Sequence, residues 1–119
     1  MPTALLALAL TLLLPGGRFT AYFTSAFTDA AYQKEAVAKI LKAWKPVVGA
    51  PAGKKTVLIA LIAKDGTLAG LRDHVMTGFK PWDDAAIAAV KKAAPFAPLP
   101  KSWAFPTMEV HFHFEVTAR

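Results

Sequence analysis

Residues 108–116 alternate apolar and polar side chains without a single exception. Successive side chains of a β-strand point to opposite faces, so this period of two predicts a strand with one buried face and one face in water. The chain has 119 residues, about the length of one domain. The apolar set is Met108, Val110, Phe112, Phe114 and Val116, and the polar set is Glu109, His111, His113 and Glu115.

Residues 30–45 have the spacing of an amphipathic helix. Asp29 is suited to be its N-cap, because a carboxylate accepts hydrogen bonds from the free N–H groups of a first turn, and Pro46 ends it. The positions of one apolar helix face are occupied by Val37, Ile40, Leu41 and Trp44, and much of the remaining surface is occupied by Lys34, Lys39, Lys42 and Lys45.

Residues 56–63 and 68–77 are expected to form a hairpin, with an Asp-Gly turn at residues 65–66. A second, alanine-rich helix begins near Pro81 and ends before Pro95. The order α-β-β-α-β predicts an α+β fold, a two-layer sandwich of one three-stranded antiparallel sheet with two helices on one face.

Residues 4–14 form an unbroken apolar run rich in Leu and Ala, followed by the helix breakers Pro15, Gly16 and Gly17. A helix of this length spans about 16 Å, whereas a bilayer core measures about 30 Å. The run is typical of a signal peptide. We therefore expect residues 1–28 to be a signal peptide or a short N-terminal anchor with its leader, and residues 29–119 to be the domain. The alternative interpretation of the run is a buried core segment.

An ordered series of short motifs resembles the TonB/TolA C-terminal domain family over residues 30–116. A helix that ends in Trp-x-Pro is closest to its TolA-like branch, and the family's Ser-Ser-Gly before the second helix is replaced by Met76-Thr77-Gly78. The resemblance is carried by Tyr32, Val37, Ile40, Trp44-Lys45-Pro46, Asp65-Gly66, Gly78, residues 84–90 (DAAIAAV) and residues 94–100 (APFAPLP).

The resemblance implies a periplasmic, non-enzymatic protein-binding module that acts in envelope transport or integrity. Its partner is an envelope protein or peptide segment, from an outer-membrane receptor or a periplasmic protein, which adds as an extra strand to the edge of the last strand. Only residues 15–29 separate the apolar run from the first helix, so we expect the binding module without the long linker of an energy transducer. The expected partner-binding residues are Val110, His111, Phe112, His113, Phe114 and Trp103.

His111 and His113 share the polar face of their strand, about 6.5–7 Å apart along the chain. Such a pair chelates a divalent metal when a third ligand converges on it, and Glu109, Glu115 and His74 are the candidates. The simpler interpretation is a solvated strand face, and we assign no metal site. A third interpretation is a pH-sensitive partner contact, because histidine titrates near pH 6.5.

Two further surfaces are open to more than one interpretation. Residues 30–55 carry six lysines and one glutamate, which suits a solvated helix face, an acidic protein partner or anionic lipid headgroups. Expected export disfavours nucleic acid, and contact with a membrane is expected only through an uncleaved N-terminus. Residues 56–63 are apolar on both faces, so a homodimer through a sheet face or edge is the alternative function, that of a self-associating structural protein of the envelope.

Nothing in the sequence indicates catalysis. The chain has no cysteine, its serines Ser25 and Ser102 lack a nucleophile-elbow context, and no phosphate-binding loop or dinucleotide motif is present. Asp83 and Asp84 are neighbours on the predicted helix and do not face each other, so they suit the helix N-terminus better than acid–base chemistry. We therefore expect no enzyme and no cofactor.

Overall fold

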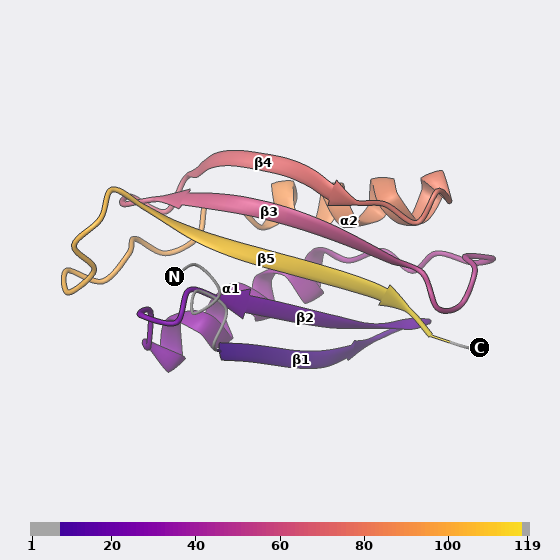
Figure 1. The fold of residues 1–119 in the computed structure, drawn as a ribbon, viewed down its shortest axis with the longest axis horizontal. Helices are drawn as coiled ribbons and strands as arrows, with labels where there is room; N and C mark the ends of the chain where they lie inside the picture. Colours follow the sequence, from indigo (N-terminus) through magenta and orange to yellow (C-terminus); the bar gives the residue numbers. More distant parts are fainter. Residues whose placement is uncertain (1–7, 118–119) are drawn as a thin grey trace.

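The computed structural model describes residues 8–117 as one five-stranded antiparallel sheet with two helices on one face (Figure 1). The strand order across the sheet is β1-β2-β5-β3-β4. In chain order the elements are β1 (Leu8–Leu14), β2 (Gly17–Phe23), α1 (Ala30–Ala43), β3 (Lys55–Ala63), β4 (Leu68–Val75), α2 (Lys80–Ala93) and β5 (Thr107–Val116).

The predicted α+β class with two helices and an antiparallel sheet is confirmed, but the predicted three-stranded sheet is wrong, since the sheet has five strands. The two additional strands, β1 and β2, come from the segment that we interpreted as a signal-type run and leader. They form a hairpin whose turn contains Gly16 at φ 78°, a left-handed conformation that glycine adopts readily. Residues 4–7 of the run lie outside the described residues, and a role of the segment in export stays a prediction.

Both helices begin and end close to the residues that predicted their bounds. The Asp29 side chain accepts a hydrogen bond from the Tyr32 N–H at 2.9 Å, as an N-cap does, and α1 ends at Ala43, shortly before Pro46. Helix α2 carries Pro81 in its first turn and ends at Ala93, just before Pro95. No helix within residues 8–117 has the length and apolar character needed to cross a membrane.

The core lies between the sheet and the two helices. The alternation predicted for β5 is confirmed, because its apolar side chains are buried and its polar side chains are half-buried on the opposite face. The Trp44 ring, at the end of α1, stacks on Phe114 with centroids 5.4 Å apart and meets Trp82 of α2 edge-on at 4.8 Å. These contacts join both helices to the middle of the sheet.

Strand β3 is buried on both faces along most of its length, as its apolar sequence predicted. Val57 and Ile59 belong to the helix-free face, where they pair in register with His113 and His111 of β5. They are nevertheless only 2% and 7% exposed. This face of the sheet therefore has a cover made of its own polar side chains.

Candidate functional site

Strand β5 lies in the middle of the sheet (Figure 1). It pairs antiparallel with β2 on one side and with β3 on the other. The edge of β5 that the sequence analysis assigned to a partner is therefore occupied by β2, and that expectation is corrected. A period of two in the sequence is the same for a central strand and an edge strand, so the pattern contained no information on strand order.

The expected partner-binding residues fall into three groups. Val110, Phe112 and Phe114 are fully buried against the helices, where a partner cannot contact them in the folded chain. Trp103 is also buried, and its indole N–H donates to the Thr107 carbonyl at 3.0 Å. The two histidines lie on the opposite face of the sheet and are half-buried. The structure thus separates the histidines from the apolar residues that we had grouped with them.

The polar face of β5 is held by contacts between side chains. His111 Nε2 lies 2.6 Å from Glu109 Oε2, and the His113 ring packs on Tyr22 of β2 with centroids 4.6 Å apart. Arg18 of β2 forms a salt bridge to Glu115 at 3.0 Å. In the part of the chain that the structure describes, no group of three or more His, Cys, Asp or Glu is placed to hold a metal ion.

Burial, as the largest cause, and the positive charges of Lys55, His111 and His74 together lower the pKa of His113 from 6.5 to about 4, against the opposing effect of Glu115. His113 is therefore neutral near pH 7. The interpretation of this histidine as a contact that changes its charge close to neutrality is not supported.

The outer edge of β1, called the β1 edge below, is the backbone side of Leu8–Leu14 that faces away from β2. Strand β1 pairs with β2 over seven consecutive residues without a register shift. It carries no charged residue, and Leu12 and Leu13 are 40% and 81% exposed. A regular, uncharged, apolar edge is the kind to which another strand adds.

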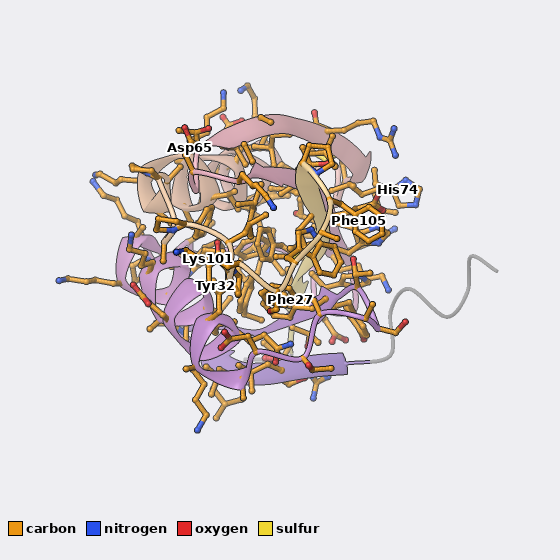
Figure 2. All side chains as sticks on the ribbon, turned by 90° about the vertical axis from the view of Figure 1, so that its left-hand side faces the viewer. Phe27, Tyr32, Asp65, His74, Lys101 and Phe105 are labelled. Carbon is orange, nitrogen blue, oxygen red and sulfur yellow. The ribbon has the colours of Figure 1, made fainter. Side chains whose placement is uncertain are left out.

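The opposite edge of the sheet, on β4, has a different character. Its pairing with β3 contains two register irregularities, and its exposed side chains include Arg72, Asp73 and His74. Figure 2 looks along the strands and shows His74 pointing into solvent on the side away from the helices. Bulges and charges are the means by which proteins protect an edge from further pairing.

Strand β2 is fixed in place between β1 and β5. A Cβ atom on Gly17 would lie 2.3 Å from the Glu115 carbonyl oxygen and 2.7 Å from the Trp82 ring, so only glycine fits here. Phe19 packs on both Phe112 and Phe114 of β5. The sequence contained a signal for this strand, since Phe19, Ala21 and Phe23 alternate with Arg18, Thr20 and Tyr22, and the first set is the buried one.

Asp83 is a buried carboxylate at the start of α2 that joins three parts of the fold. Its Oδ1 accepts from the Thr56 hydroxyl at 2.6 Å and from the Thr77 N–H and hydroxyl at 3.0 and 2.9 Å, and its Oδ2 accepts from the Gly78 N–H at 3.2 Å. Burial raises its pKa, but these hydrogen bonds outweigh burial and hold the pKa below 3.8. Thr77 supplies this hydroxyl group from the Met76-Thr77-Gly78 segment that precedes α2.

Comparison with known proteins gives one match. The family described as TonB C terminal matches residues 29–114, which begin at the N-cap of α1 and end within β5. No curated protein and no solved structure matches the chain. The matched region leaves out β1 and β2, so the hairpin lies beyond the part that the family describes.

Proposed function

This chain belongs to the TonB C-terminal family, and from that membership we propose that it is a non-enzymatic module that binds an extended segment of an envelope protein. Domains of this family are protein-interaction domains of the cell envelope, and outer-membrane receptors are typical of the proteins they contact. The proposed role of this chain lies in envelope transport or integrity.

The partner segment adds as a sixth strand at the β1 edge. The observation that carries this proposal is the unpaired, uncharged and regular backbone of Leu8–Leu14, within the part of the chain that the structure describes. The expected docking edge was the side of β5 that faces away from β3. Strands β2 and β1 follow β5 on that side, so the free edge lies two strands further out. Docking on β5 itself would require β2 to leave and expose Phe19 and Phe23, which are fully buried.

The energy available at this edge suits a reversible contact. A seven-residue strand offers about six outward N–H and C=O groups to a partner strand, each hydrogen bond contributing about 1 kcal/mol net. The exposed Leu12 and Leu13 add apolar area. Ordering a flexible segment costs part of this gain, so we expect affinity in the micromolar range, about −8 kcal/mol.

A second copy of this chain is the alternative occupant of the β1 edge. A strand that pairs antiparallel with its own copy forms a two-fold symmetric contact, because each residue meets its equivalent position across the axis. The exposed Leu12 and Leu13 favour this interpretation, since dimer formation covers them on both chains. The module would then act as a self-associating structural protein of the envelope.

We place the module in the periplasm, which the chain reaches through its N-terminal segment, and an inner-membrane anchor is the alternative. Residues 8–23 are part of the folded sheet, so the account requires the mature protein to retain them. Intact-mass measurement of the chain purified from the envelope of its own organism tests this requirement. A mature chain that begins at or after residue 17 would lack β1 and contradict docking at the β1 edge.

Site-specific photo-crosslinking in the producing organism tests the proposed edge. A benzophenone amino acid at Leu13 reports on the β1 edge, the same group at His74 reports on β4, and Val48 is an exposed loop control. We expect a crosslink from Leu13 to an envelope protein and none from Val48. A crosslink from Leu13 to a second copy identifies the dimer instead. Crosslinking from His74 alone would contradict the assignment of the β1 edge.

A further inference from the structure

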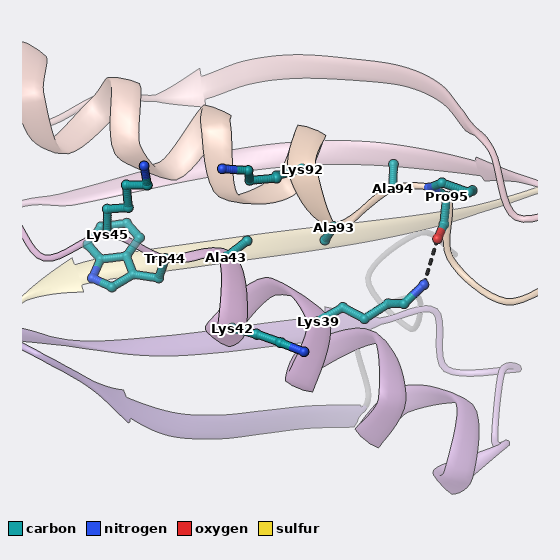
Figure 3. A pocket seen from close by; sticks show the side chains of 9 residues that line it. All are labelled: Lys39, Lys42, Ala43, Trp44, Lys45, Lys92, Ala93, Ala94 and Pro95. Carbon is teal, nitrogen blue, oxygen red and sulfur yellow. Dashed lines mark hydrogen bonds between the residues drawn. The ribbon is translucent and has the colours of Figure 1, made fainter.

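A second candidate binding surface lies between the two helices, on the side of the molecule away from the polar face of the sheet. A groove of about 590 Å³ lies between the C-terminal ends of α1 and α2 (Figure 3). Its lining includes the uncharged residues Ala43, Trp44, Ala93, Ala94 and Pro95. We call it the lysine groove, because Lys39, Lys42, Lys45 and Lys92 line it.

Most of the positive charge of the lysine groove has no partner among the residues that the structure describes. Lys39 Nζ donates to the Pro95 carbonyl at 2.7 Å, which ties α1 to the segment after α2. The ammonium groups of Lys42, Lys45 and Lys92 form no hydrogen bond or salt bridge with any residue in the range 8–117. These three ammonium groups are therefore free to bind an anion.

Helix dipoles alone do not account for this concentration of charge. The C-terminus of each helix carries about half a negative charge, so two helix ends balance about one lysine. Four lysines line the groove, and Asp84, which lines the adjoining depression, is paired with Lys80 at 2.6 Å. The surplus points to a negatively charged ligand.

The shape of the groove identifies the kind of ligand. The lysine groove continues into a second depression of about 390 Å³ that shares Ala43, Lys45 and Lys92 with it and runs on past Ala85 and Ala88 of α2. The small alanine side chains leave this seam open between the helices. A phosphate ion fills only a small part of such an elongated groove, and a flat bilayer surface reaches the lysine tips without covering the buried Ala93 between the helices.

We propose that the lysine groove binds an acidic, extended protein segment, with carboxylates paired to Lys42, Lys45 and Lys92 and an apolar side chain seated over Ala43 and Ala93. An acidic partner is one of the interpretations that the six lysines of residues 30–55 suit. The structure adds Lys92 from α2 and places it with Lys39, Lys42 and Lys45 around one groove. This site is separate from the β1 edge and does not depend on the function proposed for that edge.

Fluorescence anisotropy of the full chain with a labelled peptide tests the proposal. The probe is acetyl-Glu-Glu-Leu-Leu-Glu-Glu-amide, with Gln-Gln-Leu-Leu-Gln-Gln and Glu-Glu-Ser-Ser-Glu-Glu as peptides that lack the charge or the apolar pair. We expect the first peptide to bind more tightly than both others, and its binding to weaken as salt screens the charges. Equal binding of the Leu and Ser peptides would overturn the apolar contact, and equal binding of the Glu and Gln peptides would overturn the charge contact.

Charge reversal with a matched control locates the site. Lys42→Glu combined with Lys92→Glu changes the net charge by the same amount as Lys34→Glu combined with Lys101→Glu, at exposed positions that do not line the groove. We expect the groove variant to lose at least about tenfold in affinity, since one charge pair in water is worth about fivefold, and the control variant to change by less than about twofold. Equal losses in both variants would overturn the proposal.

Three further measurements make the result unambiguous. Lys42→Gln with Lys92→Gln replaces the charge-reversed variant if that variant does not fold by circular dichroism, and it is expected to weaken binding in the same direction. Leu13→Lys, which alters the β1 edge, is expected to leave peptide affinity unchanged. Binding of the chain to phosphatidylglycerol vesicles is measured as well. If it depends on Lys42 and Lys92 and no acidic peptide binds, the proposal of an acidic protein segment is overturned in favour of a lipid surface.

Discussion

The Phe19 ring of β2 lies against the Phe114 ring of β5, with centroids 4.9 Å apart. Both side chains are fully buried, and 95 positions separate them in the numbering of the chain. This contact makes the N-terminal hairpin part of the domain core. It also explains why the last strand lies in the middle of the sheet.

Phe19→Ala is expected to lower the free energy of unfolding by about 3–5 kcal/mol, because it removes a buried ring from a packed core. Denaturation by guanidinium chloride, followed by tryptophan fluorescence, measures the change. Phe105→Ala is the control, since Phe105 is 58% exposed and its loss should cost less than about 1 kcal/mol. Equal small effects of both substitutions would show that β2 is not packed as described.

Gly17→Ala is expected to destabilise the chain by about 1–3 kcal/mol or more, because the new methyl group overlaps the Glu115 backbone and the Trp82 ring. Gly70→Ala in β4 is the matched control. A Cβ at Gly70 meets only Leu61 at 3.6 Å, an ordinary contact, and alanine restricts the unfolded chain, so this variant should be neutral or slightly stabilised. Thermal denaturation of the two variants separates these outcomes. A Gly17→Ala protein as stable as Gly70→Ala would contradict the close approach of β2 to Trp82.

Asp83→Asn is expected to destabilise the chain by about 1–3 kcal/mol at pH 7, since an amide nitrogen cannot accept the hydrogen bonds that the carboxylate accepts. The pKa of Asp83 is lower in the folded chain than in the unfolded chain, so its stabilising contribution is present above pH 3.8 and is lost as the pH falls through the folded value. The variant should therefore lose less stability than the wild type between pH 7 and pH 3.

Asp84→Asn is the control for Asp83, because its pairing with Lys80 is exposed to solvent and contributes little to stability. Urea denaturation at the two pH values compares the three proteins. If Asp83→Asn and Asp84→Asn are equally stable at pH 7, Asp83 does not join α2 to β3 and the preceding turn.

His113→Gln is expected to reduce the loss of stability on mild acidification. The folded pKa of about 4 lies below the ordinary value of 6.5, so the unfolded chain takes up a proton between these values while the folded chain does not. Stability of the wild type therefore falls as the pH drops from 7 to 4. The melting temperature should fall less in His113→Gln than in the wild type, and His74→Gln, at an exposed position on β4, should retain most of the wild-type pH dependence. Equal pH dependence in the wild type and His113→Gln would contradict the lowered pKa.

The sequence predicted the elements whose boundaries depend on local chemistry. Asp29 and Pro46 place α1, Pro81 and Pro95 place α2, and the strict alternation of residues 108–116 describes β5. Each of these signals acts within a few residues, through a cap, a missing N–H or the pleat of a strand.

The features that the sequence did not predict depend on distant contacts. The leucines of β1 have no clear period, and an apolar run of this length is equally typical of a signal peptide and of a strand. Its conformation follows from pairing with β2, and the place of β2 follows from Phe19 and Gly17 packing on β5 and Trp82. The lysine groove likewise depends on the packing of two helices, which places Lys42 and Lys92 around one groove. No local sequence pattern predicts that arrangement.

A proline scan of the β1 edge tests the central claim most directly. Ala9, Leu10, Thr11, Leu12 and Leu13 are replaced by proline one at a time, and each folded variant is titrated with a peptide of the partner segment crosslinked at Leu13. Proline is tolerated on an edge strand where the replaced N–H points outward, so alternate variants should fold. Those variants should lose at least about fivefold in affinity, because each lacks one hydrogen bond to the added strand. Unchanged affinity in every folded variant would contradict strand addition at the β1 edge.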